Sequence, residues 1–94
     1  MEIRNVKNKA LKAFIESETT KGLPSAHIDK IRDIITFLLE AETIEEIFDL
    51  PKYKPHRLKG SRAGTFSLSV TANWRITFAH NSNEITDLDF EDYH

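Results

Sequence analysis

The sequence contains no cysteine among its 94 residues, and it has only three glycines and three prolines. Without cysteine there are no disulfide bonds, and no reaction can use a thiolate as nucleophile or metal ligand. No apolar stretch approaches the roughly 20 residues that a membrane-spanning helix requires, and the residues after Met1 do not form a signal peptide. We therefore expect a cytoplasmic protein that does not contact a membrane.

Histidine is also scarce, and its spacing argues against a metal site. The four histidines are His27, His56, His80 and His94. None has a partner three or four residues away, which is the spacing of two ligands on one helical face. We expect His27 on the polar side of a helix and His80 in a turn, both at the surface. We expect no metal ion and no other cofactor.

The net charge is small, but the charges are unevenly distributed. The formal charge is −2, so the whole chain is not a polycation. Five basic residues fall within a run of eleven that contains no acid: Lys52, Lys54, Arg57, Lys59 and Arg62. Acidic residues precede this run and crowd the C-terminal end. A local basic patch can bind phosphate on such a chain because electrostatic fields are short-ranged at physiological salt. A solvated loop is the alternative.

The most regular pattern lies between Thr65 and Phe78. Apolar and polar residues alternate on both sides of Ala72-Asn73, which predicts two strands joined as a hairpin. We expect burial of the face with the apolar residues Phe66, Leu68, Val70, Trp74, Ile76 and Phe78. The other face carries hydroxyl groups and Arg75, and we expect it to be a working surface.

Helical spacing of apolar residues dominates the first half of the chain. It predicts one helix over residues 5–16 and a second from about Pro24 to Ala41. A capping box at residues 43–46 predicts a short third helix that ends before Pro51.

The basic run predicts a short edge strand at residues 54–58. Residues 80–83 read as a turn, and residues 84–91 as the last strand. In that strand the alternation places Leu88 and Phe90 in the core. It places Ile85 and Tyr93 on the polar face, unless a bulge shifts the phase. The prediction is one α+β domain over residues 1–94, with two main N-terminal helices packed on one face of a small, mostly antiparallel sheet.

Two histidines and several cations match the requirements of RNA cleavage. The 2′-hydroxyl must lose a proton, the 5′-oxygen must gain one, and cations stabilise the charged phosphorane. Histidine suits both proton transfers near neutral pH. His56 lies in the basic run and His94 is the last residue, while Tyr93 offers a ring on which a base can stack. From spacing alone, ordinary surface positions are the more common reading for both histidines.

Three motifs in combination point to a family. They are H-x-L-K-G at residues 56–60, N-W-R-I-T-F at residues 73–78, and D-Y-H at residues 92–94. With the rest of the chain, they resemble the HigB toxins, or plasmid maintenance system killer proteins, of the RelE/ParE toxin–antitoxin superfamily. The resemblance implies a RelE-like fold. It also implies a ribosome-dependent endoribonuclease, an mRNA interferase that cleaves mRNA in the A site and inhibits translation.

The same resemblance implies roles for individual residues and partners. It implies that His56, Asp92, Tyr93 and His94 are catalytic. Contacts to RNA are expected from the basic residues Lys54, Arg57, Lys59, Arg62 and Arg75. The implied partners are the ribosome, mRNA and a HigA-like helix-turn-helix antitoxin. Operator DNA is expected to be bound only through the antitoxin complex.

Two other functions are compatible with such a chain. A gyrase poison of the ParE type would use the same scaffold without histidines, and the presence of His56 and His94 argues against it. A degenerate toxin would only bind the antitoxin and act as a co-repressor. The complete set of catalytic residue types argues against this second alternative.

Overall fold

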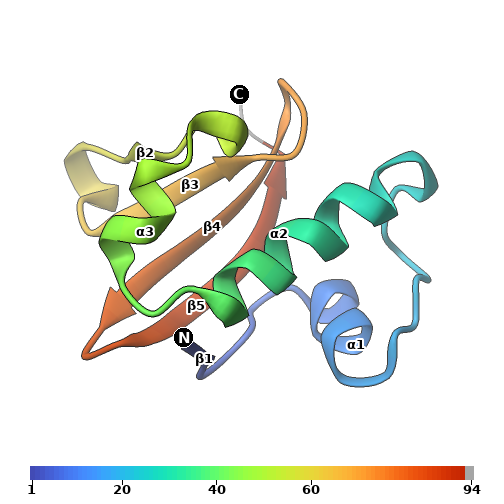
Figure 1. Cartoon of the computed structure of the whole chain (residues 1–94). Helices are drawn as coiled ribbons and strands as arrows, with labels where there is room; N and C mark the ends of the chain where they lie inside the picture. Colours follow the sequence, from blue (N-terminus) through green and yellow to red (C-terminus); the bar gives the residue numbers. More distant parts are fainter. Residues whose placement is uncertain (93–94) are drawn as a thin grey trace.

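The fold is a five-stranded sheet with its helices on one face, and the computed structural model describes residues 1–92 (Figure 1). The strands are β1 (Glu2–Ile3), β2 (His56–Arg57), β3 (Thr65–Ser69), β4 (Trp74–Asn81) and β5 (Glu84–Asp92). The sheet order is β1-β5-β4-β3-β2. Strand β1 runs parallel to β5, and every other neighbouring pair is antiparallel. The predicted α+β class and mostly antiparallel sheet are confirmed.

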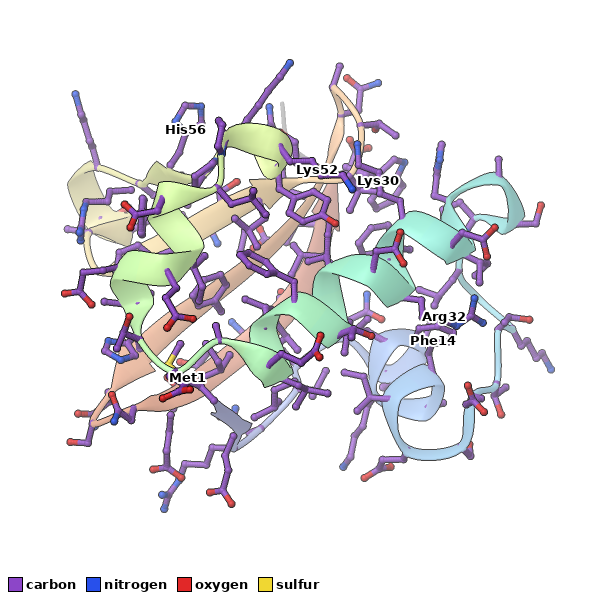
Figure 2. The ribbon with its side chains drawn as sticks, in the orientation of Figure 1. Met1, Phe14, Lys30, Arg32, Lys52 and His56 are labelled. Atoms are coloured by element: carbon purple, nitrogen blue, oxygen red, sulfur yellow. The ribbon has the colours of Figure 1, made fainter. Side chains whose placement is uncertain are left out.

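The helices cover the face of the sheet seen in Figure 1. They are α1 (Lys9–Ser17), α2 (Ile28–Glu40) and α3 (Ile44–Asp49), with short 3-10 turns η1 (Ser25–His27), η2 (Pro51–Tyr53) and η3 (Gly60–Arg62). Helix α2 buries a stripe of four aliphatic residues at helical spacing: Ile31, Ile34, Ile35 and Leu38. At the C-terminal end of α2, the amino group of Met1 donates hydrogen bonds to the carbonyl oxygens of Leu38 and Leu39 (Figure 2). Carbonyl groups in the last turn of a helix have no partner within the helix.

Helix α1 begins at Lys9, so the prediction that it starts at Asn5 was wrong. The side-chain oxygen of Asn8 accepts a hydrogen bond from the backbone N–H of Leu11 at 2.9 Å, which caps the helix. Upstream of this cap, Val6 forms a parallel bridge with Leu88 of β5. Helices α1 and α2 contact each other through Arg32 and Phe14. The guanidinium carbon of Arg32 on α2 lies over the ring of Phe14 on α1, 5.3 Å from the ring centroid (Figure 2).

The predicted third helix and its cap are confirmed. The hydroxyl oxygen of Thr43 accepts a hydrogen bond from the backbone N–H of Glu46, and the Glu46 carboxylate accepts one from the N–H of Glu42. The first bond satisfies an N–H group that the helix leaves without a partner, and the second ties the residue ahead of the cap to the first turn.

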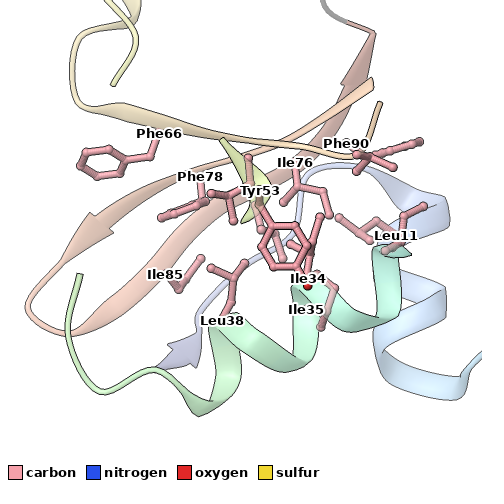
Figure 3. Packing of buried hydrophobic residues seen from close by; sticks show 14 of the residues in the cluster. Leu11, Ile34, Ile35, Leu38, Tyr53, Phe66, Ile76, Phe78, Ile85 and Phe90 are labelled. Atoms are coloured by element: carbon pink, nitrogen blue, oxygen red, sulfur yellow. The ribbon is translucent and has the colours of Figure 1, made fainter. Parts of the chain in front are cut away.

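The core lies between α1, α2 and α3 and the covered face of the sheet (Figure 3). The apolar face of the hairpin is buried as predicted, except that Trp74 is only half-buried and stacks on Phe90 with ring centroids 4.7 Å apart. On the opposite face, the hydroxyl residues Ser67, Ser69 and Thr77 are only 2%, 8% and 2% exposed. The hydroxyls of this face lie beneath longer side chains, and its role as a working surface stays a prediction.

A bulge changes the phase of β5. The ladder pairs Thr77 with Asp89 but Ala79 with Thr86, and Asp87 takes a left-handed φ of 51° at this point. The extra residue places both Ile85 and Leu88 in the core, each fully buried. The placement of Ile85 on the polar face was therefore wrong.

The turn before β5 is shorter than predicted. Its two residues, Ser82 and Asn83, have φ values of 50° and 66°, as in the tight turns favoured by hairpins. His80 therefore belongs to β4 and is half-buried, not a surface residue of a turn. His27 is also half-buried, in η1 ahead of α2.

Candidate functional site

A basic cleft opens on the side of the sheet away from the helices, between the edge strand β2, the turn η3 and strand β4. Its volume is about 430 Å³. It is lined by His56, Arg57, Leu58, Lys59, Arg62, Ser67 and Arg75. Within residues 1–92, the cleft thus joins one predicted catalytic histidine with four of the five predicted RNA-binding cations, and no carboxylate is part of its lining.

His56 reaches the cleft because β2 is a short antiparallel edge strand. The backbone takes a left-handed φ of 48° at Lys54, and Pro55 then leads into the strand. His56 pairs with Ser67 of β3, and successive side chains of a strand point to opposite faces. His56 is therefore on the face of the buried hydroxyls, and it is exposed at the edge of the sheet (Figure 2). An exposed imidazole at this position is accessible to a polymer substrate.

Arg57 follows His56 and contacts different groups. It pairs with Phe66, so its side chain extends toward the helices. Its guanidinium carbon lies 4.7 Å from the ring centroid of Phe48 and 5.1 Å from that of Phe66. These are cation–π contacts that join α3 to β3. Arg57 forms part of the cleft wall, but its charged group is engaged in packing.

Arg75 is anchored at the boundary of the cleft. Its Nη1 donates a hydrogen bond to the hydroxyl oxygen of Ser69, and its Nη2 donates one to the carbonyl oxygen of Ala72 at 3.4 Å. The residue is half-buried on β4. Anchored donors of this kind can stabilise developing negative charge without first having to reorganise.

Arg62 is held by a carboxylate that the sequence did not single out. Its two terminal nitrogens donate to the two carboxylate oxygens of Glu91 at 2.9 and 2.6 Å. The hydroxyl of Thr77 also donates to Glu91. The hydrogen bonds from Arg62 are the largest cause of a lowered Glu91 pKa, and they outweigh the opposing effect of burial. No local pattern in the sequence marks Glu91 as this partner, because Arg62 lies 29 positions away from it.

Two of the remaining predicted residues lie outside the cleft, and two lie outside the described residues. Lys54 lines a neighbouring hollow that shares Arg75 with the cleft. Asp92 pairs with Trp74 and, by the alternation of β5, shares the face of Phe90, opposite to that of His56. Tyr93 and His94 are not among the residues that the structure describes.

Two further findings concern residues 1–92. No group of three or more histidine, aspartate or glutamate side chains in this range is arranged to hold a metal ion. None of the helices in it has the length and apolar character needed to cross a membrane.

Comparison with protein families identifies the chain. The model of a family described as "RelE-like toxin of type II toxin-antitoxin system HigB" matches residues 4–94. The chain belongs to the HigB-like toxins. This toxin is also 40% identical over 94 residues to a protein of Proteus vulgaris named "Endoribonuclease HigB", covering 98% of this chain and 99% of the relative.

Solved structures of other toxins share the fold. One is described as "YoeB/ParE toxin from Agrobacterium tumefaciens", with a TM-score of 0.62, 19% identity and coverage of 100% of this chain and 99% of the other. The YoeB dimer from Staphylococcus aureus matches with a TM-score of 0.61 and 18% identity over 100% and 97% of the two chains. YafQ from E. coli matches with a TM-score of 0.60 and 18% identity over 95% and 92%.

These comparisons confirm the predicted resemblance to HigB and the RelE-like fold. Membership of a toxin–antitoxin family implies that the toxin has an antitoxin as partner. The expectation of an endoribonuclease agrees with the name of the Proteus vulgaris relative.

Proposed function

We propose that this toxin is an endoribonuclease that cleaves mRNA in the ribosomal A site and thereby inhibits translation in the cytoplasm. The observation that carries the proposal is the cleft itself. It gathers His56, Arg62 and Arg75 around the buried hydroxyl residue Ser67, and none of its described lining residues is an acid. Membership of the HigB-like toxins and the name of the 40% identical relative support the assignment to the endoribonucleases.

The reaction that suits these groups is an internal transfer at phosphorus. The ribose 2′-oxygen attacks the phosphorus, the bond from phosphorus to the 5′-oxygen breaks, and a cyclic phosphate and a free 5′-hydroxyl result. One group must take the 2′-hydroxyl proton, and another must give a proton to the departing 5′-oxygen. We assign these two transfers to His56 and His94. An imidazole can accept or donate a proton near neutral pH.

The cations of the cleft stabilise the charge of the phosphorane. Arg75 is the best placed of them because Ser69 and Ala72 already orient its guanidinium. Lys59 adds an exposed positive charge, and Arg62 adds a guanidinium that Glu91 holds at the other wall. We propose that Lys54 contacts a phosphate farther along the RNA strand. Arg57 contributes mainly by its packing on Phe48 and Phe66.

The assignments of Asp92, Tyr93 and His94 rest on the match of the D-Y-H motif to the HigB pattern. Tyr93 would stack on a base of the substrate, since every base offers a π-face. The partner that we propose for neutralisation is a HigA-like helix-turn-helix antitoxin. Operator DNA is then reached only through that complex.

The test is mRNA cleavage on ribosomes in a purified translation system, mapped by primer extension. We expect the wild-type toxin to cut within the A-site codon. His56→Ala should lower the rate by about 10²- to 10⁴-fold, the usual contribution of general acid–base catalysis. His94→Ala should lower it in the same way. His27→Ala is the matched control, since His27 is not part of the cleft, and it should cut at the wild-type rate.

Other outcomes would reject the proposal in different ways. Cleavage that survives both His56→Ala and His94→Ala would contradict the proton transfers but keep the nuclease. A folded wild-type toxin that leaves ribosome-bound mRNA intact would reject the nuclease. Damaged DNA in arrested cells would then indicate a gyrase poison, and the absence of growth arrest would indicate a non-catalytic antitoxin-binding protein.

A further inference from the structure

A second hollow lies next to the basic cleft and carries a denser set of lysines. Its volume is about 390 Å³. We call it the lysine hollow, and it is lined by Lys30, Lys52, Lys54, Ser69, Thr71, Ala72 and Arg75. Lys30 comes from α2 and Lys52 from η2, and both residues are labelled in Figure 2, where they lie near each other. Arg75 belongs to both linings, so the hollow and the cleft are neighbours.

The charges of the lysine hollow are all of one sign. Three lysines and one arginine line it, and none of its described lining residues is an acid. None of the three salt bridges found within residues 1–92 involves Lys30, Lys52 or Lys54. Like charges held close together repel one another, and a bound anion removes that repulsion.

The hydroxyl groups of Ser69 and Thr71 in the hollow can each donate a hydrogen bond. The oxygen of Thr71 accepts hydrogen bonds from the backbone N–H groups of Asn73 and Trp74 at 3.2 and 3.0 Å. The oxygen of Ser69 accepts one from Arg75. A hydroxyl whose oxygen already accepts still has its own hydrogen to donate. Both groups therefore suit an anion with several acceptor oxygens rather than a cation.

We propose that the lysine hollow binds a phosphate group of RNA other than the one at which the chain is cut. Lysine is a common phosphate ligand because its ammonium group is a compact charge with three donors. The inference rests on the proposed function for the identity of the polymer. The phosphate belongs either to an mRNA nucleotide beside the cleavage site or to ribosomal RNA, and the chemistry of recognition is the same for both.

The first experiment probes the site with inorganic phosphate alone. Phosphate is titrated into the toxin, and the backbone amide signals of Ser69 and Thr71 are followed by NMR. We expect both signals to shift in the wild type. The shifts should be lost in the double variant Lys30→Ala/Lys52→Ala and kept in the control Lys9→Ala/Lys21→Ala. The control removes the same charge from positions that line neither the cleft nor the hollow.

The second experiment identifies the polymer. Affinity is measured for a short 2′-O-methyl RNA, which cannot be cleaved, and for ribosomes with an empty A site. We expect the Lys30/Lys52 variant to lose roughly tenfold in affinity for at least one of them. For the oligonucleotide, the slope of log affinity against log salt should fall by about 0.7 for one lost phosphate contact. Weaker oligonucleotide binding identifies mRNA, and weaker ribosome binding alone identifies ribosomal RNA.

Several results would overturn the inference. One is phosphate-induced shifts in the Lys30/Lys52 variant that equal those of the Lys9/Lys21 control. Another is loss of the shifts with both RNA affinities unchanged, which would refute the assignment to RNA. Weaker binding of the antitoxin with no change toward phosphate or RNA would make the hollow a protein-binding surface. None of these measurements needs cleavage, so a failure of the nuclease proposal would be seen separately.

Discussion

At the scale of single residues, the ion pair between Arg62 and Glu91 positions one wall of the cleft. Glu91 accepts two hydrogen bonds from Arg62 and one from Thr77, so it holds the guanidinium of Arg62 at the wall of the cleft. Two parallel bonds between a guanidinium and a carboxylate also define the orientation of Arg62. The acidic cluster at the end of the chain thus includes a positioning group for the basic cleft.

Replacing Glu91 should have an effect on stability that depends on pH. The pKa of Glu91 is lowered in the folded protein, chiefly by Arg62. Its contribution is therefore complete above the ordinary carboxyl pKa of about 4.5 and is lost as the pH falls through the lowered value. At pH 7 we expect Glu91→Gln to reduce the free energy of unfolding by about 1 kcal/mol or less, because both partners are partly exposed. Urea unfolding at pH 7 and pH 3 measures the difference.

The control is a double-mutant cycle with Arg62→Gln. In the Arg62→Gln background, the effect of Glu91→Gln at pH 7 should largely disappear, since the ion pair is already absent. A difference between wild type and Glu91→Gln that is the same at pH 7 and pH 3 would contradict the prediction.

At this scale, the sequence can group residues only where they share a local motif. The H-x-L-K-G and N-W-R motifs predicted His56, Lys59 and Arg75, and the structure places all three around one cleft. The sequence could not predict that Arg57 packs on Phe48, or that Lys30 of α2 lines the same hollow as Lys52 of η2. Both arrangements depend on how separate elements pack together, which no local motif specifies.

At the scale of elements, the bulge in β5 is held by a residue from the start of the chain. The backbone N–H of Asp87 donates to the side-chain oxygen of Asn5 at 3.0 Å, and the Asn5 amide nitrogen donates to the Asp87 carboxylate at 3.0 Å. These bonds hold Asp87 in its left-handed conformation and let both Ile85 and Leu88 face the core. Alternation within β5 alone could not reveal this, because the stabilising residue lies 82 positions earlier.

The bulge gives a prediction at positions 5 and 87. Asn5→Ala should lower the free energy of unfolding by about 1–2 kcal/mol, because it removes both hydrogen bonds and leaves the Asp87 N–H without this acceptor. Asp87→Ala should cost about the same, since alanine is disfavoured at positive φ. Both values are measured by urea denaturation.

Asp87→Asn is the matched control for the bulge. Asparagine tolerates the left-handed conformation and keeps a side-chain oxygen that can accept from Asn5, so we expect a change within about 0.5 kcal/mol. Equal destabilisation by Asp87→Asn and Asp87→Ala would show that conformation and hydrogen bonding at this residue do not determine the stability of the bulge.

At the scale of the whole molecule, one face of the sheet forms the hydrophobic core and the other face carries the basic cleft. One face packs on the helices, and its residues Ile76 and Phe78 are fully buried together with Ile34 of α2 in the core between them. The other face carries the basic cleft, whose lining includes the buried hydroxyl residue Ser67. The class of fold and this division were predictable, because the period-two hairpin pattern marks one apolar face. The parallel pairing of β1 with β5 was not, since it joins the two ends of the chain.

Because the core and the cleft lie on different faces, we expect core substitutions to change stability and cleft substitutions to change the rate of cleavage. Ile34→Val removes one buried methyl group from α2 and should cost about 0.5–1.5 kcal/mol. Each kcal/mol lowers the Tm of a domain of this size by about 4–8 °C. Cleavage on ribosomes at 25 °C should stay within about twofold of wild type, because Ile34 contributes nothing to the cleft. Leu39→Ala, on the same helix but 49% exposed, should change neither measurement appreciably. A cleavage rate that falls in Ile34→Val while the protein stays folded would mean that helix packing sets the geometry of His56 and Arg75 through the sheet.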